Sequence, residues 1–255
     1  MLTSKRTGFV FLLLALFLMF QTSYADPPLP TPVGRVVWIK GTLKAMQPNN
    51  ETRNLVKMSV LYLHDTLITD ANSTAEVAFT DNTLITFYPN SKLSIDKYAY
   101  KQKPANGSAG SSVMSLIEGG FRTITGLIAK TNNNDYQVNT PVATIGVRGT
   151  DYAVRMQGGH LYAAWYQGKP CLTSKNAQDN SQNTQKKQQG TELCLSSTTQ
   201  FAEVPGLGQV PILLNSLPDA LNEKLQVTSV KISPFGTNTK IIYKGGVITS
   251  FCITQ

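Results

Sequence analysis

The sequence contains 255 residues, with 23 Lys and Arg against 15 Asp and Glu, and a formal net charge of +8. The basic residues are scattered and form no dense stripe with stacking aromatic residues, so the sequence argues against a nucleic-acid-binding protein. The length is sufficient for one all-β domain with its own hydrophobic core and an extension.

The N-terminus has the composition of a secretory signal peptide. Lys5 and Arg6 precede an apolar run over residues 8–20, and the Ser-Tyr-Ala sequence at 23–25 has small residues where a signal peptidase cleaves. The run is shorter than the roughly 20 residues of a membrane span. We therefore expect a signal peptide over residues 1–25 and a periplasmic or secreted mature chain that starts at Asp26. Loss of Lys5 and Arg6 lowers its charge from +8 to +6. We expect no transmembrane span in it; an uncleaved N-terminal anchor is the alternative.

Short strands are predicted along most of the mature chain. Residues 26–32 contain four prolines and predict an extended leader. Residues 33–40 and 42–46 then predict a hairpin that turns at Gly41. Many short apolar stretches separated by turn residues follow. They indicate an all-β fold, in the form of a β-roll, solenoid or sandwich.

Two further turns support this strand pattern. Ala75, Val77 and Phe79 alternate with polar residues, which predicts a strand with one buried face. The Asp81-Asn82 pair turns this strand into a second one over residues 84–88. Pro89-Asn90 then turns the chain again.

The densest strand signal lies over residues 136–156. Ala143, Ile145 and Val147 would share one face of a first strand, and Tyr152, Val154 and Met156 one face of a second. Gly146 and Gly149 bracket the turn between them, and Pro141 is expected at a strand start because it cannot donate a ladder hydrogen bond.

This segment resembles the signature of the FecR-domain family, the periplasmic modules of bacterial surface signalling. The residues that carry the resemblance are Thr140-Pro141-Val142-Ala143-Thr144-Ile145-Gly146-Val147-Arg148-Gly149-Thr150-Asp151, with Phe121-Arg122-Thr123-Ile124 and the turns at Asp65 and Asp81-Asn82 upstream. The similarity extends over roughly residues 33–203. It implies a FecR-like β domain, assigned here to residues 33–204, and a function in binding. FecR regulators also carry a membrane helix and a sigma-factor-binding segment, and we expect neither in this chain.

The signature residues Thr140, Pro141, Gly146, Arg148, Gly149, Thr150 and Asp151 are the candidate docking site. Among them we expect Arg148 and Asp151 to form a hydrogen-bonded clamp that holds the turn. The alternative is a corner at which a partner docks. Tyr162, Trp165 and Tyr166 form a second candidate patch, although aromatic residues on strands more often pack in the core.

The cysteines indicate an oxidising compartment. Cys171 and Cys194 flank a polar loop over residues 174–190, and a disulfide across its base would stabilise the fold by about 3 kcal/mol. Two free thiols are the alternative. Cys252 is then left unpaired, as a buried thiol or for an intermolecular bond.

The last part of the chain, residues 205–255, is predicted as a β-rich C-terminal extension. Residues 218–225 predict one short helix, and 226–232 and 240–252 predict strands on either side of a turn at 234–236.

No catalytic or metal-binding signature is present. His64 and His160 have no Cys or carboxylate at the spacing of a zinc site, and no nucleophile elbow, phosphate loop or dinucleotide fingerprint occurs. We therefore predict a protein without enzymatic activity or cofactor, which binds an envelope protein in signalling or assembly. A protein that binds a glycan or another envelope polymer is the alternative.

Overall fold

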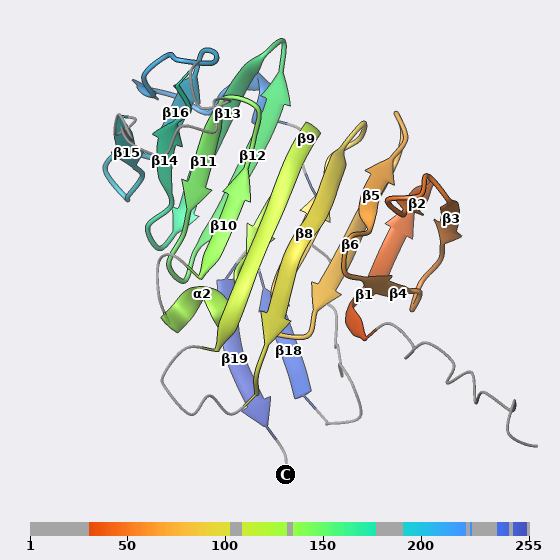
Figure 1. The fold of residues 1–255 in the computed structure, drawn as a ribbon. Coiled ribbons are helices and arrows are strands. Elements are labelled where there is room, and N and C mark those ends of the chain that lie inside the picture. The colour runs from red at the N-terminus through yellow and green to blue at the C-terminus, as the bar shows by residue number, and fades with distance from the viewer. Residues whose placement is uncertain are drawn as a thin grey trace, which may run out of the picture. The chain divides into compact units, whose positions relative to one another are not determined.

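Two β-sheets packed face to face form the domain in the computed structural model (Figure 1), which describes residues 31–102, 109–131, 135–176, 191–222 and 225, with the backbone of 239–244 and 247–253. Seventeen strands belong to one hydrogen-bonded network, because strand β9 takes part in both sheets. The network is not closed among the described residues. The expectation of an all-β fold of many short strands is therefore confirmed.

Sheet A contains nine strands, all antiparallel to their neighbours. In spatial order these are β4 (Val60–Tyr62), β1 (Pro32–Lys40), β6 (Thr74–Phe79), β7 (Leu84–Phe87), β9 (Gly110–Ile124), β12 (Asp151–Gln157), β13 (His160–Gln167), β16 (Phe201–Val204) and β17 (Ile212–Leu214).

Sheet B contains β9 again, with eight other strands. In spatial order it consists of β3 (Thr52–Leu55), β2 (Leu43–Met46), β5 (Thr66–Thr69), β8 (Lys92–Tyr100), β9, β10 (Tyr136–Asn139), β11 (Ala143–Gly146), β14 (Cys171–Ser174) and β15 (Glu192–Cys194). The β9–β10 pair is the parallel one among these.

Strand β9 passes from sheet B to sheet A near Gly119 and Gly120. Its first part, up to Glu118, pairs with β8, and its last part pairs with β7 and β12. Gly119 has a φ of +65°, and a Cβ atom there would lie 2.2 Å from the carbonyl oxygen of Asn90. A side chain at Gly120 would lie 2.2 Å from the carbonyl oxygen of Val154. The crossing therefore depends on two residues without side chains.

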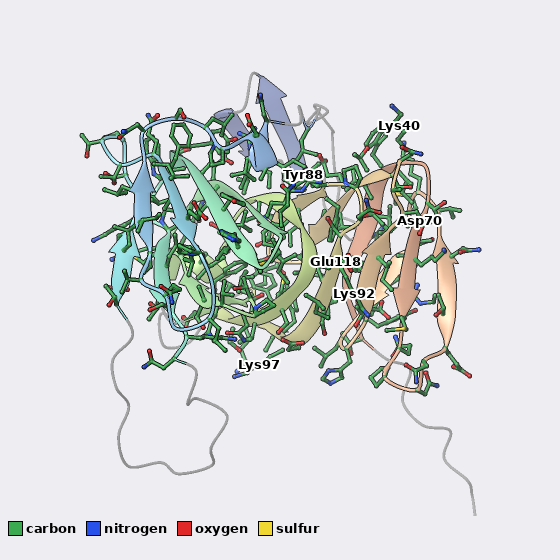
Figure 2. All side chains as sticks on the ribbon, turned by 90° about the horizontal axis from the view of Figure 1, so that it is seen from above. Lys40, Asp70, Tyr88, Lys92, Lys97 and Glu118 are labelled. Carbon is green, nitrogen blue, oxygen red and sulfur yellow. A yellow bond between two sulfur atoms is a disulfide. The ribbon has the colours of Figure 1, made fainter. Side chains whose placement is uncertain are left out.

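The hydrophobic core lies between the inner faces of the two sheets (Figure 2). The largest side chains buried in it are Tyr136, Tyr152, Phe79, Phe87, Phe121, Leu43, Leu61, Leu67, Ile85, Leu93 and Ile95. Residues that alternate along each strand supply this core, as the period of two predicts.

The predicted hairpin of residues 33–46 is wrong in its pairing. Both strands exist, as β1 and β2, but β1 pairs with β4 and β6 while β2 pairs with β3 and β5. Gly41, with a φ of +84°, takes the chain from one sheet to the other against the side chain of Ser73. A turn glycine can redirect a strand to another layer as well as fold it back on itself.

The strand β6 has two buried faces, whereas its alternation predicted one. Val77 and Phe79 point into the core and are fully buried. Glu76, on the opposite face, is only 1% exposed. The expected turn to β7 is confirmed, because Ala78 pairs with Leu84 across it.

The C-terminal part is only partly described. In place of the helix predicted over 218–225, a 3₁₀ helix spans Asp219–Leu221. The strands β18 (Thr239–Lys244) and β19 (Val247–Ile253) pair with each other, so two strands occupy the segment where one strand over 240–252 was predicted. Four predicted features lie wholly or mostly outside the described residues: the signal peptide, the leader, the strand at 226–232 and the turn at 234–236. Among those described, no helix is long and apolar enough to cross a membrane.

Candidate functional site

A cleft of about 500 Å³ opens where β9 passes between the sheets. Three turns surround it: the β7–β8 turn, the β10–β11 turn and the β12–β13 hairpin. The lining residues are Pro89, Asn90, Ile117, Glu118, Gly119, Pro141, Val142, Arg155, Met156, Gln157, Gly158 and Gly159. The cleft contains one residue of the predicted docking site, Pro141, and its position was not predicted from the sequence.

The cleft exists because β9 loses a strand neighbour before it joins sheet A. Strand β10 ends at Asn139, opposite Ser115, and the chain then turns away. On the β12 side, the pairing of β9 begins only at Gly119. Ile117 and Glu118 therefore have no strand partner on that side among the described residues, and the Ile117 side chain is 46% exposed. An apolar side chain beside an open strand edge is suited to binding an extended polypeptide.

Charged groups of both signs lie at the cleft. The exposed carboxylate of Glu118 sits on β9 opposite Lys92 of β8 (Figure 2). Arg155 is held in place, because its guanidinium donates to the carbonyl oxygen of Ala220 at 3.1 Å and lies 5.1 Å from the centre of the Tyr88 ring. These groups can orient a ligand, but they include no nucleophile with an adjacent base.

The predicted signature segment forms three strands rather than two. It contains β10 and β11 in sheet B and β12 in sheet A, so that residues 147–150 connect the two sheets. Its apolar residues point inward as expected: Ala143 and Ile145 are fully buried, and Val147 is 1% exposed.

Two threonines of the signature anchor its turns. Thr140 Oγ1 accepts hydrogen bonds from the backbone N–H groups of Val142 and Ala143, the second at 2.9 Å. Thr150 donates its backbone N–H to Oγ1 of Thr125 at 2.7 Å, and its carbonyl accepts the N–H of Thr125. Both threonines are 3% exposed, so their contacts stabilise the fold and leave them little surface for a partner.

The predicted pairing of Arg148 with Asp151 is wrong. The partner of Asp151 is Arg122 on the neighbouring strand β9, which donates from Nε at 2.9 Å and from Nη2 at 2.8 Å. The Arg122 guanidinium also lies 4.2 Å from the centre of the Tyr166 ring. Arg148 is exposed in the connection between β11 and β12. Because Arg122 lies 29 residues before Asp151 in the sequence, only the strand register identifies it as the partner.

The exposed members of the predicted docking site are Pro141 and Arg148. They lie at opposite ends of β11, which is four residues long and therefore spans about 13 Å. Only Pro141 lines the cleft. The signature thus combines buried structural residues with two separate exposed positions, and its part in docking stays a prediction.

Burial shifts the pKa of three carboxyl groups that lie outside the cleft. Burial raises the pKa of Glu76 to about 7, a rise opposed by the hydrogen bond from Thr86. Burial also raises the pKa of Asp81, which accepts hydrogen bonds from the backbone and side chain of Thr83 and is fully buried. Burial raises the pKa of Asp151, against the hydrogen bonds and charge of Arg122. Burial thus opposes ionisation of all three carboxyl groups, and at Asp151 the Arg122 guanidinium counters this effect.

A row of hydroxyl and amide side chains crosses the outer face of sheet B. Its members, one per strand from β5 to β14, are Thr66, Ser94, Ser115, Asn139, Thr144 and Thr173. Each is half-buried. Two acceptors order the row: Asp96 accepts from Ser94 at 2.7 Å and from Ser115, and Asn139 accepts from Thr144 at 3.2 Å.

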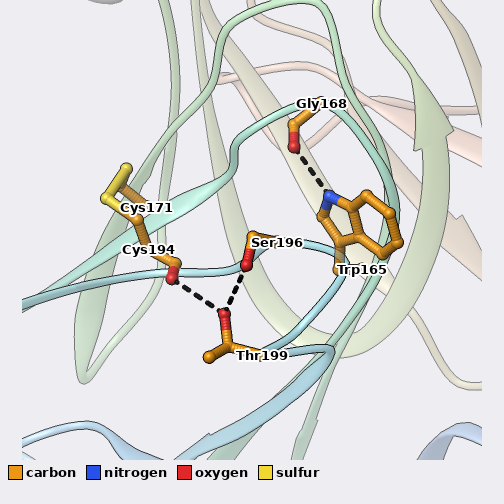
Figure 3. Close-up of a disulfide and its surroundings, with 6 residues drawn as sticks. All are labelled: Trp165, Gly168, Cys171, Cys194, Ser196 and Thr199. Carbon is orange, nitrogen blue, oxygen red and sulfur yellow. Dashed lines mark hydrogen bonds between the residues drawn. A yellow bond between two sulfur atoms is a disulfide. The ribbon is translucent and has the colours of Figure 1, made fainter.

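The predicted disulfide between Cys171 and Cys194 is present (Figure 3), and it joins paired residues of β14 and β15. Glu192 lies close to both sulfur atoms, but the S–S bond leaves no thiolate there for a metal. On β13, Trp165 donates to the carbonyl oxygen of Gly168 at 2.7 Å (Figure 3). Cys252 lies in β19, whose side chains are outside the described part, so its state stays a prediction.

The predicted aromatic patch is divided between two faces of β13. Trp165 packs against the core between the sheets. Tyr162 packs with the smaller buried cluster around Tyr88 and Leu221. Tyr166 is 39% exposed, beside Arg122. The three side chains therefore do not form one binding surface.

Comparison with known proteins identifies the domain. The family model described as "FecR protein" matches residues 65–169, from the start of β5 to the end of β13. No curated protein matches the chain. Two crystal structures from Parabacteroides distasonis, each described as "a putative anti-sigma factor", are similar to it at 12% identity. One has a TM-score of 0.41 and covers 60% of each chain; the other has a TM-score of 0.38 and covers 59% of this chain and 58% of the other. The chain thus spans less than two thirds of these structures. Residues 65–169 of the chain therefore match a FecR domain.

Proposed function

We propose that this FecR-domain protein is an exported, non-enzymatic module that binds a protein partner in bacterial envelope signalling or assembly. The observation that carries the proposal is the cleft at the β9 crossing. It joins an open strand edge, the exposed Ile117 and the signature residue Pro141 in one concave surface. The disulfide between Cys171 and Cys194 supports an oxidising compartment.

Affinity capture of the whole chain from an envelope extract, followed by mass spectrometry, tests the binding site. Ile117→Asp places a charge in the cleft, and Met58→Asp is the matched control, because Met58 is 53% exposed in the β3–β4 turn. We expect a partner that wild type and Met58→Asp recover and that Ile117→Asp loses, with equal melting temperatures for all three. Equal recovery by both variants would refute the cleft as the binding site.

Export is tested separately by intact-mass analysis of the protein expressed in a Gram-negative host. We expect a mature N-terminus at Asp26 in the periplasmic fraction, because the small residues end at Ala25. Retention of residues 1–25, or a protein confined to the cytoplasm, would contradict the proposal whatever the result of the capture.

Glycan binding is the second candidate, and the ordered polar row on sheet B favours it. Fixed hydroxyl and amide groups on a regular strand spacing can hydrogen-bond to a hydroxyl-rich polymer. A glycan array with wild type and Asn139→Ala distinguishes the two functions. Binding that is lost in Asn139→Ala and kept in Ile117→Asp would support the glycan function.

A further inference from the structure

The edge of sheet A at β17 is unusually apolar for an exposed surface. Ten large hydrophobic side chains of the described residues are exposed, and five of them lie within residues 207–217. These five are Leu207 (49% exposed), Val210 (52%), Ile212 (43%), Leu213 (50%) and Leu217 (37%). Exposed large apolar side chains that are concentrated in one segment point to an interaction surface.

Both faces of β17 contribute to this surface. Leu213 pairs with Ala202, which is fully buried in the core between the sheets, so Leu213 lies on the inner face. Ile212 pairs with Glu203 and lies on the outer face. On its second edge β17 pairs with no other strand among the described residues. An added strand would therefore find both backbone hydrogen-bonding groups and apolar contacts.

The charge pattern indicates which strand fits there. No charged residue occurs between Glu203 and Asp219, although the whole chain carries a net charge of +8. Two copies of a basic protein repel each other, so they can approach most closely where both surfaces are uncharged. The edge strands β3 and β15 contain charged residues, Arg53 and Glu192 respectively. The edge strand β4 is uncharged but exposes no large apolar side chain, so all three match β17 less well than a second β17 does.

We propose that two copies of this chain associate through antiparallel pairing of their β17 strands, so that sheet A continues from one copy into the other. A twofold axis beside Leu213 places this residue opposite Leu213 of the second copy and places Ile212 opposite Leu214. The strand is three residues long, so the contact is smaller than a standard specific interface. The dimer is therefore reversible and depends on concentration. This proposal is independent of the cleft and its partner.

Sedimentation velocity of the full mature chain over a range of concentrations tests the proposal. Leu213→Lys adds a charge to the edge, and Val56→Lys is the matched control, since Val56 is 68% exposed at the β3–β4 turn. We expect wild type and Val56→Lys to shift from monomer to dimer as concentration rises, and Leu213→Lys to stay monomeric with an unchanged melting temperature. High salt should leave the wild-type dimer intact or strengthen it, because the contact is apolar.

Disulfide trapping tests the strand geometry. In a Cys252→Ser background, Leu213→Cys should form a covalent dimer on oxidation, and Val56→Cys should not. A wild type that is monomeric at every concentration overturns the proposal, as does a dimer that Leu213→Lys leaves unchanged. A wild-type monomer that instead binds lipid vesicles or an added strand of another protein also overturns it. Failure of Leu213→Cys to crosslink overturns the antiparallel pairing.

Discussion

Replacement of Arg122 by Ala should strongly destabilise the domain. The Arg122 and Asp151 side chains are 17% and 4% exposed, and two hydrogen bonds of 2.9 and 2.8 Å join them. Removing one partner of a buried ion pair costs about 3 to 5 kcal/mol, because the other charge stays buried without compensation. We expect about 3 kcal/mol, since water retains some access to the site. For a domain of this size that corresponds to a fall in melting temperature of roughly 6 to 12 °C.

Two variants make the experiment specific. Arg148→Ala is the matched control, and it should change stability by less than about 0.5 kcal/mol because Arg148 is exposed. Arg122→Lys keeps the charge but loses the planar fork and the stacking on Tyr166, so it should fall between wild type and Arg122→Ala. Urea and thermal denaturation, followed by circular dichroism, measure these differences.

The pH dependence provides a second test of the same pair. Burial already raises the pKa of Asp151, and Arg122 opposes that rise. Without Arg122, the folded-state pKa rises further above the unfolded value of 3.8. The folded variant then holds a proton that the unfolded chain releases, so its stability falls as the pH rises through this interval. The loss relative to wild type should be largest at neutral pH. Equal losses in Arg122→Ala and Arg148→Ala, or no loss in the former, would refute this reasoning.

Three further outcomes are expected. Burial raises the pKa of Glu76 from 4.5 to about 7, so the stability of the wild type should fall as the pH rises through this window. Glu76→Gln should remove this pH dependence. Above pH 7 the variant should be more stable than the wild type by on the order of 3 kcal/mol, as measured by urea titration. Replacement of Cys171 and Cys194 by Ser removes a link across 23 residues and should lower the free energy of unfolding by about 3 kcal/mol in the same titration. An unchanged free energy would mean that β14 and β15 stay paired without the disulfide. Gly119→Ala should lower the free energy of unfolding by more than about 2 kcal/mol, because its Cβ would meet the backbone of Asn90. Gly158→Ala is the control, since Gly158 has a similar φ but its Cβ would meet no atom within 4 Å. A comparable loss of stability in both variants would contradict the proposed role of the crossing.

The amino-acid sequence determined the local elements of this protein and its family. Alternation of Ala75, Val77 and Phe79 predicted β6, and the Asp81-Asn82 turn predicted its hairpin with β7. The polar loop between Cys171 and Cys194 predicted the disulfide. These features depend on side-chain period and on turn residues close in sequence, which a single sequence displays directly.

The tertiary structure alone decided which strands pair and which charges meet. Gly41 is a residue type that is common in hairpin turns, yet here the chain passes through it into the other sheet. Strand order depends on contacts between distant segments, which a local turn signal does not show. Arg122 is 29 residues from Asp151, and the register of β9 against β12 brings them together. The cleft has the same origin, since it lies where one long strand leaves one sheet for the other and leaves part of its edge without a partner. Register and layer crossing are properties of the packed sheets, and no local pattern encodes them.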